Sequence, residues 1–185
     1  MIVVLTAACG AKPPVPTGSN TMGTKTTESV TEEGLIVESV DLNLDGRPNI
    51  LNYWRDIGND RRRLVRKKTD LNLNGTFDIV SHFDESGALV LEEMDTDFDG
   101  RIDWIDHYKD GQRTMSEVDT SFDGRTDTFV YFEPDGSGTN VLTRKERDTN
   151  GDGQIDTWER FGPDGVVVRM GRDTTGDGKM DQRYD

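Results

Sequence analysis

The chain has 185 residues, a formal net charge of −14 and only 32% hydrophobic residues. This length allows one ordinary domain or a short array of repeats, and the low hydrophobic content with this net charge would by itself indicate disorder. A single cysteine excludes an internal disulfide, and no stretch approaches the ~18 apolar residues of a membrane-spanning helix. The one basic cluster, 61–68, is small beside the acidic residues, so we expect no nucleic-acid partner.

Residues 1–9 are apolar and end in small residues and the only cysteine, in the order Met1-Ile-Val-Val-Leu-Thr-Ala-Ala-Cys9. This segment resembles the end of a bacterial lipoprotein signal peptide, which is cut before a cysteine that then carries the lipid. The resemblance implies lipidation at Cys9 and a membrane partner through the lipid anchor. Because the segment has no basic start, we expect the true start to lie upstream of Met1. The alternative is a frayed end with a buried cysteine.

Residues 10–32 are rich in Gly, Pro, Ser and Thr, and this composition predicts a flexible tether. Gly10 follows the cysteine, where an aspartate in Gram-negative lipoproteins would favour retention in the inner membrane. The resemblance therefore implies the bacterial outer membrane or cell surface, with a periplasmic or secreted protein as the alternative. A repeat domain is predicted over 33–185.

A twelve-residue acidic loop recurs six times in that domain. It opens at Asp41, Asp70, Asp95, Asp119, Asp148 and Asp173, at intervals of 29, 25, 24, 29 and 25 residues. A near-fixed period of this size predicts a repeat array. The six windows contain 19 of the 36 acidic residues, so the acidity belongs to the loops and is not a general solvating coat. Six divalent ions would bring the formal charge to about −2.

The fifth loop, 148–159, shows the pattern most fully. Oxygen-bearing side chains stand at positions 1, 3, 5, 9 and 12, and glycine at position 6 permits a sharp turn. Ca²⁺ takes about six to eight oxygens, which such a loop supplies from alternate residues, the carbonyl of position 7 and a carboxylate at position 12. The alternative is an Asp-Gly hairpin turn with acidic neighbours. We expect several Ca²⁺ ions, up to about six.

The predicted metal ligands are the oxygen-bearing residues at these positions in each loop. They are Asp41, Asn43, Asp45, Asn49, Asp70, Asn72, Asn74, Asp78, Asp95, Asp97, Asp99, Arg101, Asp103, Asp106, Asp119, Ser121, Asp123, Asp127, Asp148, Asn150, Asp152, Gln154, Asp156, Glu159, Asp173, Thr175, Asp177 and Asp181. Some loops depart from the pattern, with Asn49, Asn74 and Ser121 in place of acids, and Val130 and Tyr184 at position 12. These substitutions predict weaker binding in loops 1, 2, 4 and 6, so loops 3 and 5 should bind best.

Turn sequences between the loops, such as Gly162-Pro163-Asp164-Gly165, separate β-branched and aromatic segments and predict hairpins. A lone hairpin is marginal in water, so the hairpins must stack. The predicted fold is all-β: an array of stacked antiparallel β-hairpin repeats, a meander of solenoid type, with calcium loops along one edge and tight turns along the other.

Two columns run through the repeats. Position 14 is aromatic (Trp54, Phe83, Tyr108, Phe132, Phe161) and position 11 is apolar (Leu51, Val80, Ile105, Phe129, Trp158). Because the positions differ by three, a flat strand places them on opposite faces. Either both faces are partly covered or a bulge beside the metal loop realigns one column.

The segment 95–103, Asp-Thr-Asp-Phe-Asp-Gly-Arg-Ile-Asp, resembles the DxDxDGxxD calcium loops of thrombospondin type 3 repeats. Pairing of this loop with a Trp- or Tyr-bearing hairpin looks like the repeats of bacterial secreted lipoproteins, over residues 33–185. The loops are also similar to EF-hand loops, but strand composition replaces the flanking helices. The resemblance implies metal binding and says little about a biological role.

We predict a calcium-rigidified surface lipoprotein that serves as a structural spacer or interaction module, with a protein or polysaccharide partner. The alternative is an adhesin that binds carbohydrate or protein through its aromatic columns, which an exposed aromatic stripe would favour. An enzyme is not expected. His82 and His107 share a sheet column with Tyr53, Tyr131 and Arg160, and metal ligation already accounts for the carboxylate spacing.

Overall fold

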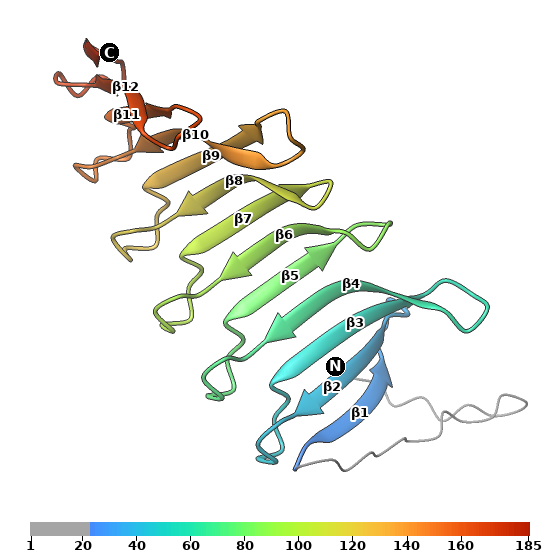
Figure 1. Ribbon diagram of the computed structural model, residues 1–185. Helices are drawn as coiled ribbons and strands as arrows, with labels where there is room; N and C mark the ends of the chain where they lie inside the picture. Colours follow the sequence, from blue (N-terminus) through green and yellow to red (C-terminus); the bar gives the residue numbers. More distant parts are fainter. Residues whose placement is uncertain (1–22) are drawn as a thin grey trace, which may run out of the picture. The chain divides into compact units, whose positions relative to one another are not determined.

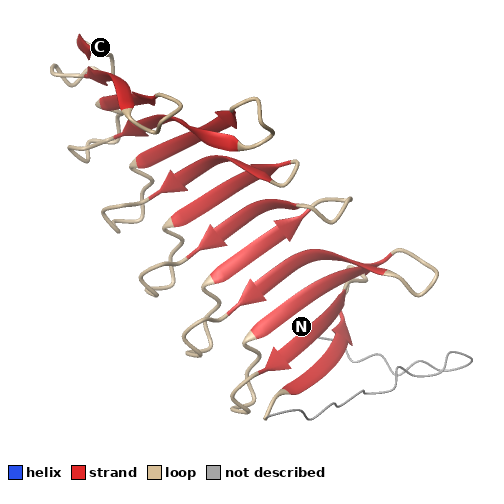
Figure 2. Ribbon diagram, viewed as in Figure 1, coloured by secondary structure: helices blue, strands red, loops and turns tan. Residues whose placement is uncertain are grey.

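The computed structural model describes residues 23–185, which contain thirteen β-strands and no helix (Figure 2). The chain divides into two units, Met1–Ala88 and Leu89–Asp185. The strands of unit 1 are β1 (Lys25–Val30), β2 (Ile36–Asp41), β3 (Ile50–Asp56), β4 (Arg62–Thr69) and β5 (Ile79–Phe83). The strands of unit 2 are β6 (Leu89–Met94), β7 (Trp104–Lys109), β8 (Gln112–Val118), β9 (Thr128–Pro134), β10 (Asn140–Arg147), β11 (Thr157–Phe161), β12 (Val167–Arg172) and β13 (Gln182–Tyr184).

Within each unit the strands pair antiparallel in chain order, as a meander (Figure 1). The sequence explains this arrangement, because β-branched and aromatic segments alternate with short turns that antiparallel neighbours require. The acidic loops lie at one end of the strands and the tight turns at the other. The prediction of an all-β array of stacked hairpins is confirmed.

A β-bulge interrupts the register of four hairpins at the same place. Tyr53 pairs with Arg66 but Trp54 pairs with Leu64, which leaves one extra residue in the return strand β4. The same shift occurs between His107 and Tyr108. The remaining two shifts are those at Arg160/Phe161 and Leu142/Arg144. The bulge thus lies near the tight turns and in the return strand, whereas the outgoing strand that carries positions 11 and 14 stays regular.

Positions 11 and 14 therefore lie on opposite faces of the sheet, and both faces are partly covered. Most strand residues are half-buried. Among residues 23–185 the buried apolar side chains are Val37 and Val118, whereas fourteen buried residues are polar or charged. The buried interior is thus mostly polar and is concentrated toward the acidic loops.

Cationic side chains cover part of the aromatic surface. The guanidinium of Arg66 lies 4.1 Å from the centre of the Tyr53 ring, and that of Arg144 lies 3.8 Å from the Tyr131 ring. Arg113 covers Phe132 in the same way at 4.4 Å. Such contacts give each ring an apolar and electrostatic partner, and the strands of residues 23–185 form no second layer over these faces.

The tether expected over 10–32 is shorter than predicted at its C-terminal end. Residues 25–30 form strand β1, which pairs with β2 from Lys25↔Asp41 to Val30↔Ile36. Thr and Ser are common in linkers, but Thr26 and Thr27 are β-branched and pack well beside a strand. The predicted tether over residues 10–22, and Cys9, lie outside the described residues. No helix in residues 23–185 has the length and apolar character needed to cross a membrane.

Candidate metal sites

Each acidic loop connects a return strand to the next outgoing strand, and neighbouring loops within a unit are joined through the backbone. The N–H of Asp70 donates to the carbonyl of Asn49 (2.8 Å). In unit 2 the N–H groups of Asp119, Asp148 and Asp173 donate to the position 9 carbonyls of the preceding loops. The loops therefore continue the sheet ladder, and the geometry of one loop is coupled to that of its neighbour.

Position 1 organises the turn. In loop 3, Asp95 Oδ1 accepts a hydrogen bond from the N–H of Phe98 (2.7 Å) and Oδ2 accepts one from the N–H of Gly100 (2.8 Å). The other five loops repeat the bond from the position 6 glycine. Gly100 has φ +93°, a conformation that a residue with a Cβ rarely adopts, which explains the glycine at position 6. These carboxylates are buried in loops 1 to 4.

Positions 3 and 5 form successive side-chain turns. Asp97 Oδ1 accepts from the N–H of Asp99 (3.0 Å), and Asp99 Oδ1 accepts from the N–H of Arg101 (2.8 Å). In each of these carboxylates Oδ1 accepts a hydrogen bond from the backbone N–H two residues further along the loop, and Oδ2 takes no part in that turn. Equivalent bonds to the N–H of position 7 are made by Asp45, Asn74, Asp123, Asp152 and Asp177.

The position 3 residues that are not acids also lie within their loops. Asn43 and Asn150 donate to the position 5 carboxylates Asp45 and Asp152. Ser121 and Thr175 donate their hydroxyls to the position 1 carboxylates. Asn72 Oδ1 accepts from the N–H of Asn74 (3.0 Å). Positions 1, 3 and 5 are therefore brought together in every loop.

Position 9 fastens the end of the loop to its beginning. Asp103 Oδ2 accepts from the N–H (2.7 Å) and the hydroxyl (2.8 Å) of Thr96 at position 2. Asp127, Asp156 and Asp181 make the same pair of bonds to the threonine at position 2. Asn49 replaces the acid without loss of this function, because its Oδ1 accepts from the N–H of Leu42 (2.7 Å).

Asp78 in loop 2 differs from these residues. It is fully buried, and its Oδ2 accepts from the N–H of Leu71 (2.6 Å), but its Oδ1 is buried without a hydrogen-bond partner. The sequence gives the reason: loop 2 has Leu71 and Ile79 where loop 5 has Thr149 and Thr157, whose hydroxyls donate to Asp156 Oδ1. A buried carboxylate oxygen without a partner carries a large desolvation cost, which a bound cation would offset.

The prediction placed Asp106 and Glu159 at position 12 among the ligands, but the structure places both on the sheet. Asp106 is buried and accepts from Ser116 Oγ (2.5 Å) and Trp104 Nε1 (2.8 Å). Glu159 forms an ion pair with Arg147 (3.0 Å). The cause is geometric. After position 9 the chain enters a strand, and three extended residues carry position 12 about 10 Å further along it.

Position 7 was predicted to contribute its backbone carbonyl, at Arg101 and Gln154. Their N–H groups donate to the position 5 carboxylates Asp99 and Asp152, so both residues lie in the turn as expected. The guanidinium of Arg101 also pairs with Asp99 Oδ2. This pair lowers the pKa of Asp99 and places a competing positive charge beside a predicted ligand.

Two groups of three carboxylates converge closely enough to hold a metal ion, among the residues that the structure describes. They are Asp95, Asp97 and Asp99 in loop 3, and Asp173, Asp177 and Asp181 in loop 6, with one oxygen of each residue within 4.8 Å of the others. Loop 6 was expected to bind weakly because Tyr184 stands at position 12. In this loop positions 1, 5 and 9 converge, whereas Tyr184 lies on strand β13, and the weak binding of loop 6 stays a prediction.

The electrostatic environments of these two groups differ. Partial desolvation and the neighbouring carboxylates Asp99, Asp103 and Asp95 raise the pKa of Asp97. In loop 6, the N–H of Thr174 is the main cause that lowers the pKa of Asp181. For Asp173, burial raises the pKa, but the N–H groups of Gly176 and Gly178 outweigh it and the net pKa is lowered. The two directions follow from the surroundings, because like charges disfavour the ionised carboxylate of Asp97, whereas N–H donors favour those of Asp173 and Asp181.

One recurrent loop feature was missed by the sequence analysis. Position 4 has a left-handed backbone in every loop, and in four of them it carries a large apolar residue: Leu44 (φ 61°), Leu73 (61°), Phe98 (66°) and Phe122 (59°). Loops 5 and 6 have glycine there, at Gly151 and Gly176. The alternation of glycine with Leu and Phe in this column could have indicated a left-handed position.

Each unit also has an open groove away from the carboxylate clusters. The groove in unit 1, of about 490 Å³, is lined by Glu33, Tyr53 and Arg66 among others, and the groove in unit 2, of about 440 Å³, by Gln112 and Phe132 among others. Neither lining includes a histidine or cysteine. That the chain is not an enzyme stays a prediction.

No protein-family model and no curated protein matches the chain. Among solved structures, a similar chain occurs in the crystal structure of accessory secretory protein 1, 2 and 3 in Streptococcus pneumoniae, with 13% sequence identity and a TM-score of 0.35. The match covers 66% of this chain and 19% of that one, so the chain spans about a fifth of the length of that structure.

Proposed function

We propose that the chain binds calcium in its edge loops and uses the ions to stiffen a sheet that has little apolar core. The observation that carries the proposal is the convergence of three carboxylates in loop 3 and in loop 6. The buried and unpartnered Oδ1 of Asp78 supports it, because a bound cation would give this oxygen the partner that two hydroxyls supply to Asp156 in loop 5.

The donor set favours calcium over other metals. All candidate ligands are carboxylate, amide, hydroxyl or carbonyl oxygens, which suit hard cations and not the softer ions bound by cysteine or histidine. Irregular loops with mixed oxygens suit Ca²⁺, whereas Mg²⁺ demands a stricter octahedron and releases its water reluctantly.

Stiffening is a mechanical consequence of this binding. Without ions, the loop carboxylates repel one another along the strand ends; with ions, the same residues cross-link positions 1, 3 and 5. Because neighbouring loops share a backbone hydrogen bond, order in one loop supports order in the next. A stiff array behind a lipid anchor at Cys9 would serve as a spacer or interaction module at a bacterial surface, with a protein or polysaccharide partner.

An adhesin that uses an aromatic stripe stays a prediction, and the two tryptophans of unit 2 do not share one face. Trp104 lies on the face of Asp106 and Ser116, whereas Trp158 lies at position 11 on the opposite face. Both rings are half-buried.

The test is a calcium titration by calorimetry and native mass spectrometry. We expect several ions to bind with dissociation constants of roughly 10⁻⁴–10⁻³ M, and Mg²⁺ to bind more weakly. Asp99→Asn keeps the acceptor for the N–H of Arg101 but removes the charge, so it should remove or weaken one site. Asp164→Asn, at a hairpin tip where it accepts from Val166, is the matched control. No ion uptake at about 10 mM calcium would contradict the proposal.

A further inference from the structure

Exposed apolar side chains concentrate on the acidic loops. Of the fourteen large hydrophobic residues that are exposed among residues 23–185, eight lie within positions 1 to 9 of the six loops. They are Leu42, Leu44, Leu71 and Leu73 in unit 1, and Phe98, Ile102, Phe122 and Met180 in unit 2. We call these eight residues the apolar tips. An edge built only to bind ions has no need of them.

The backbone makes their presence harder to explain by folding alone. Leu44, Leu73, Phe98 and Phe122 occupy left-handed positions that glycine fills at no steric cost, as Gly151 and Gly176 do in loops 5 and 6. Their side chains are 41–55% exposed, so burial does not offset the strain. Strain retained without a packing benefit points to a function.

From these tips and the adjoining carboxylates we propose that the loop edge of each unit docks on an anionic lipid surface in the presence of calcium. The inference rests on the proposed function. Bound ions would cancel the charge of the carboxylates and present open coordination positions to lipid phosphates, while the apolar tips enter the interface between the head groups. Basic residues at position 7 add attraction for the same phosphates: Arg47, Arg101, Arg125 and Lys179.

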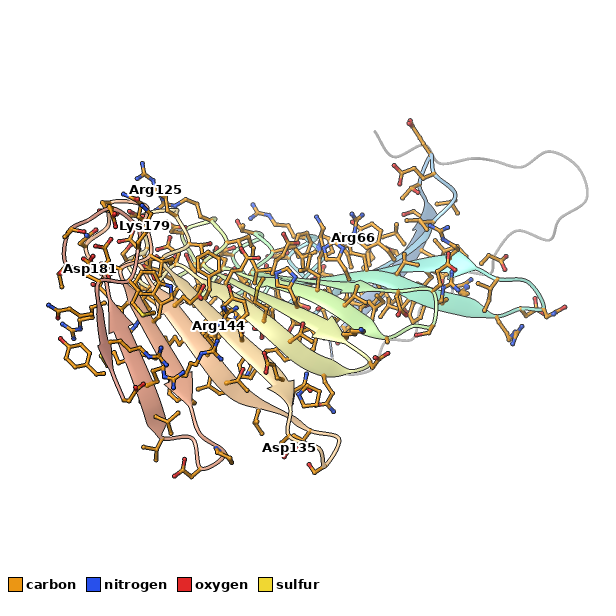
Figure 3. The ribbon with its side chains drawn as sticks, turned by 90° about the horizontal axis from the view of Figure 1, so that it is seen from above. Arg66, Arg125, Asp135, Arg144, Lys179 and Asp181 are labelled. Carbon is orange, nitrogen blue, oxygen red and sulfur yellow. The ribbon has the colours of Figure 1, made fainter. Side chains whose placement is uncertain are left out.

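The spacing of the tips favours lipid over a protein partner. Successive loops are separated by two strands, or about 10 Å, and each tip is flanked by carboxylates and exposed backbone. A protein partner would need a separate matched pocket for each tip, whereas acyl chains accept isolated side chains independently. In unit 2, Arg125, Lys179 and Asp181 lie at the loop edge and Asp135 at the opposite end (Figure 3), so one edge combines both charge signs with the tips.

The experiment is cosedimentation of the full chain with vesicles of phosphatidylcholine, alone or mixed with phosphatidylglycerol, in calcium and in chelator. A Cys9→Ser background excludes any contribution from acylation. The test variant combines Leu44→Gly, Leu73→Gly, Phe98→Gly and Phe122→Gly, which keep the left-handed backbone. The control is Val166→Ser, which removes an apolar side chain that is 59% exposed at the turn end of its hairpin.

We expect the parent to bind mixed vesicles in calcium and to be released by chelator. The quadruple variant should bind about tenfold less or weaker still, with unchanged calcium uptake and no loss of thermal stability, and Val166→Ser should bind like the parent. Equal binding by the quadruple variant would overturn the inference. So would calcium uptake without vesicle binding, which would leave the proposed function intact and point to a protein partner. Failure to take up calcium would overturn both.

Discussion

Asp78 and Asp127 occupy the same loop position but have different surroundings. Both oxygens of Asp127 accept hydrogen bonds, from Thr120 and Thr128, whereas Asp78 Oδ1 has no partner. The cost of burying an unpartnered charged oxygen is several times that of burying an amide, because an ion loses more hydration. The same Asp→Asn substitution at these two residues therefore tests how much an unpartnered carboxylate oxygen destabilises a loop when no ion is bound.

Asp78→Asn keeps an acceptor for the N–H of Leu71 and removes the buried charge. We expect it to raise the free energy of unfolding by about 1 kcal/mol in chelator, and to lose this advantage or become destabilising in calcium. Asp127→Asn should destabilise in both conditions. Urea denaturation with and without calcium measures both, and a destabilised Asp78→Asn in chelator would show that Oδ1 does not carry an unpaired cost.

The turn aspartates Asp84 and Asp135 predict a dependence of stability on pH. Hydrogen bonds from the hydroxyls of Ser86 and Ser137 (2.6 Å each) and from nearby N–H groups lower the pKa of both carboxyls. A carboxyl whose pKa is lower in the folded state stabilises the fold above its unfolded pKa of about 3.9, and this contribution disappears as pH falls through the folded pKa.

The double variant Asp84→Asn/Asp135→Asn should therefore be less stable than the wild type near neutral pH, and the difference should vanish in acid. Urea melts in chelator across that range measure this, because chelator removes any contribution of bound ions. A difference that stays constant as pH falls would exclude the ionised carboxylates as its source.

At the level of elements, the sequence predicted the parts that depend on local chemistry. The period of the aspartates, the turn residues and the β-branched segments were enough for the meander and the loop edge. Strand β1 was missed because Thr26 and Thr27 have the composition of a linker, and only pairing with β2 shows that they form a strand. The bulge in the return strands was also missed, because an extra residue such as Val65 leaves no distinct mark in the sequence.

The sequence also predicted only part of the candidate site. Positions 1, 3, 5 and 9 were predicted correctly as neighbours, because one tight turn fixes them all. Position 12 differs from the expected geometry: an EF-hand-like loop turns back over its ion, whereas here Asp106 and Glu159 lie on extended strands. That these two residues bind the ion stays a prediction. Asp78 Oδ1 has no partner because Leu71 and Ile79, at positions 2 and 10, have no hydroxyl to donate. This could not be predicted until the structure placed these three side chains together.

Glu159 tests whether the residue at position 12 binds the ion. Glu159 is buried and its partner Arg147 is partly exposed, so Glu159→Gln should lower the free energy of unfolding by about 1 kcal/mol, equally in calcium and in chelator. The calcium affinity of loop 5 should change little, whereas Asp152→Asn in the same loop should weaken it. If Glu159→Gln instead abolished binding in loop 5, a carboxylate at position 12 would have to reach the ion.

For the whole molecule, the scarcity of buried apolar residues is the main energetic fact. Val37 and Val118 are the buried apolar side chains among residues 23–185, so hydrophobic burial contributes less here than in an ordinary domain of this size. Cross-strand pairs, cation–π contacts and the polar interior of the loops must supply the rest, and we expect bound ions to add a large share.

The lipid anchor is the second proposal at this scale. If Cys9 is lipidated, the full-length protein in its own cell should partition into detergent, and Cys9→Ser should release it into the aqueous phase. Phase partition with a nonionic detergent measures this. A wild-type protein that stays in the aqueous phase would contradict the lipoprotein assignment.

Thermal unfolding in calcium and in chelator tests the central claim most directly. At a free concentration about ten times the dissociation constant, each ion adds about 1.4 kcal/mol, so six sites would add roughly 8 kcal/mol, comparable to the whole stability of a typical domain. Since about 1 kcal/mol shifts the Tm of a chain this long by roughly 2–4 °C, calcium should raise Tm by about 15 °C or more. Equal values of Tm in calcium and in chelator would contradict calcium as the element that stiffens this sheet.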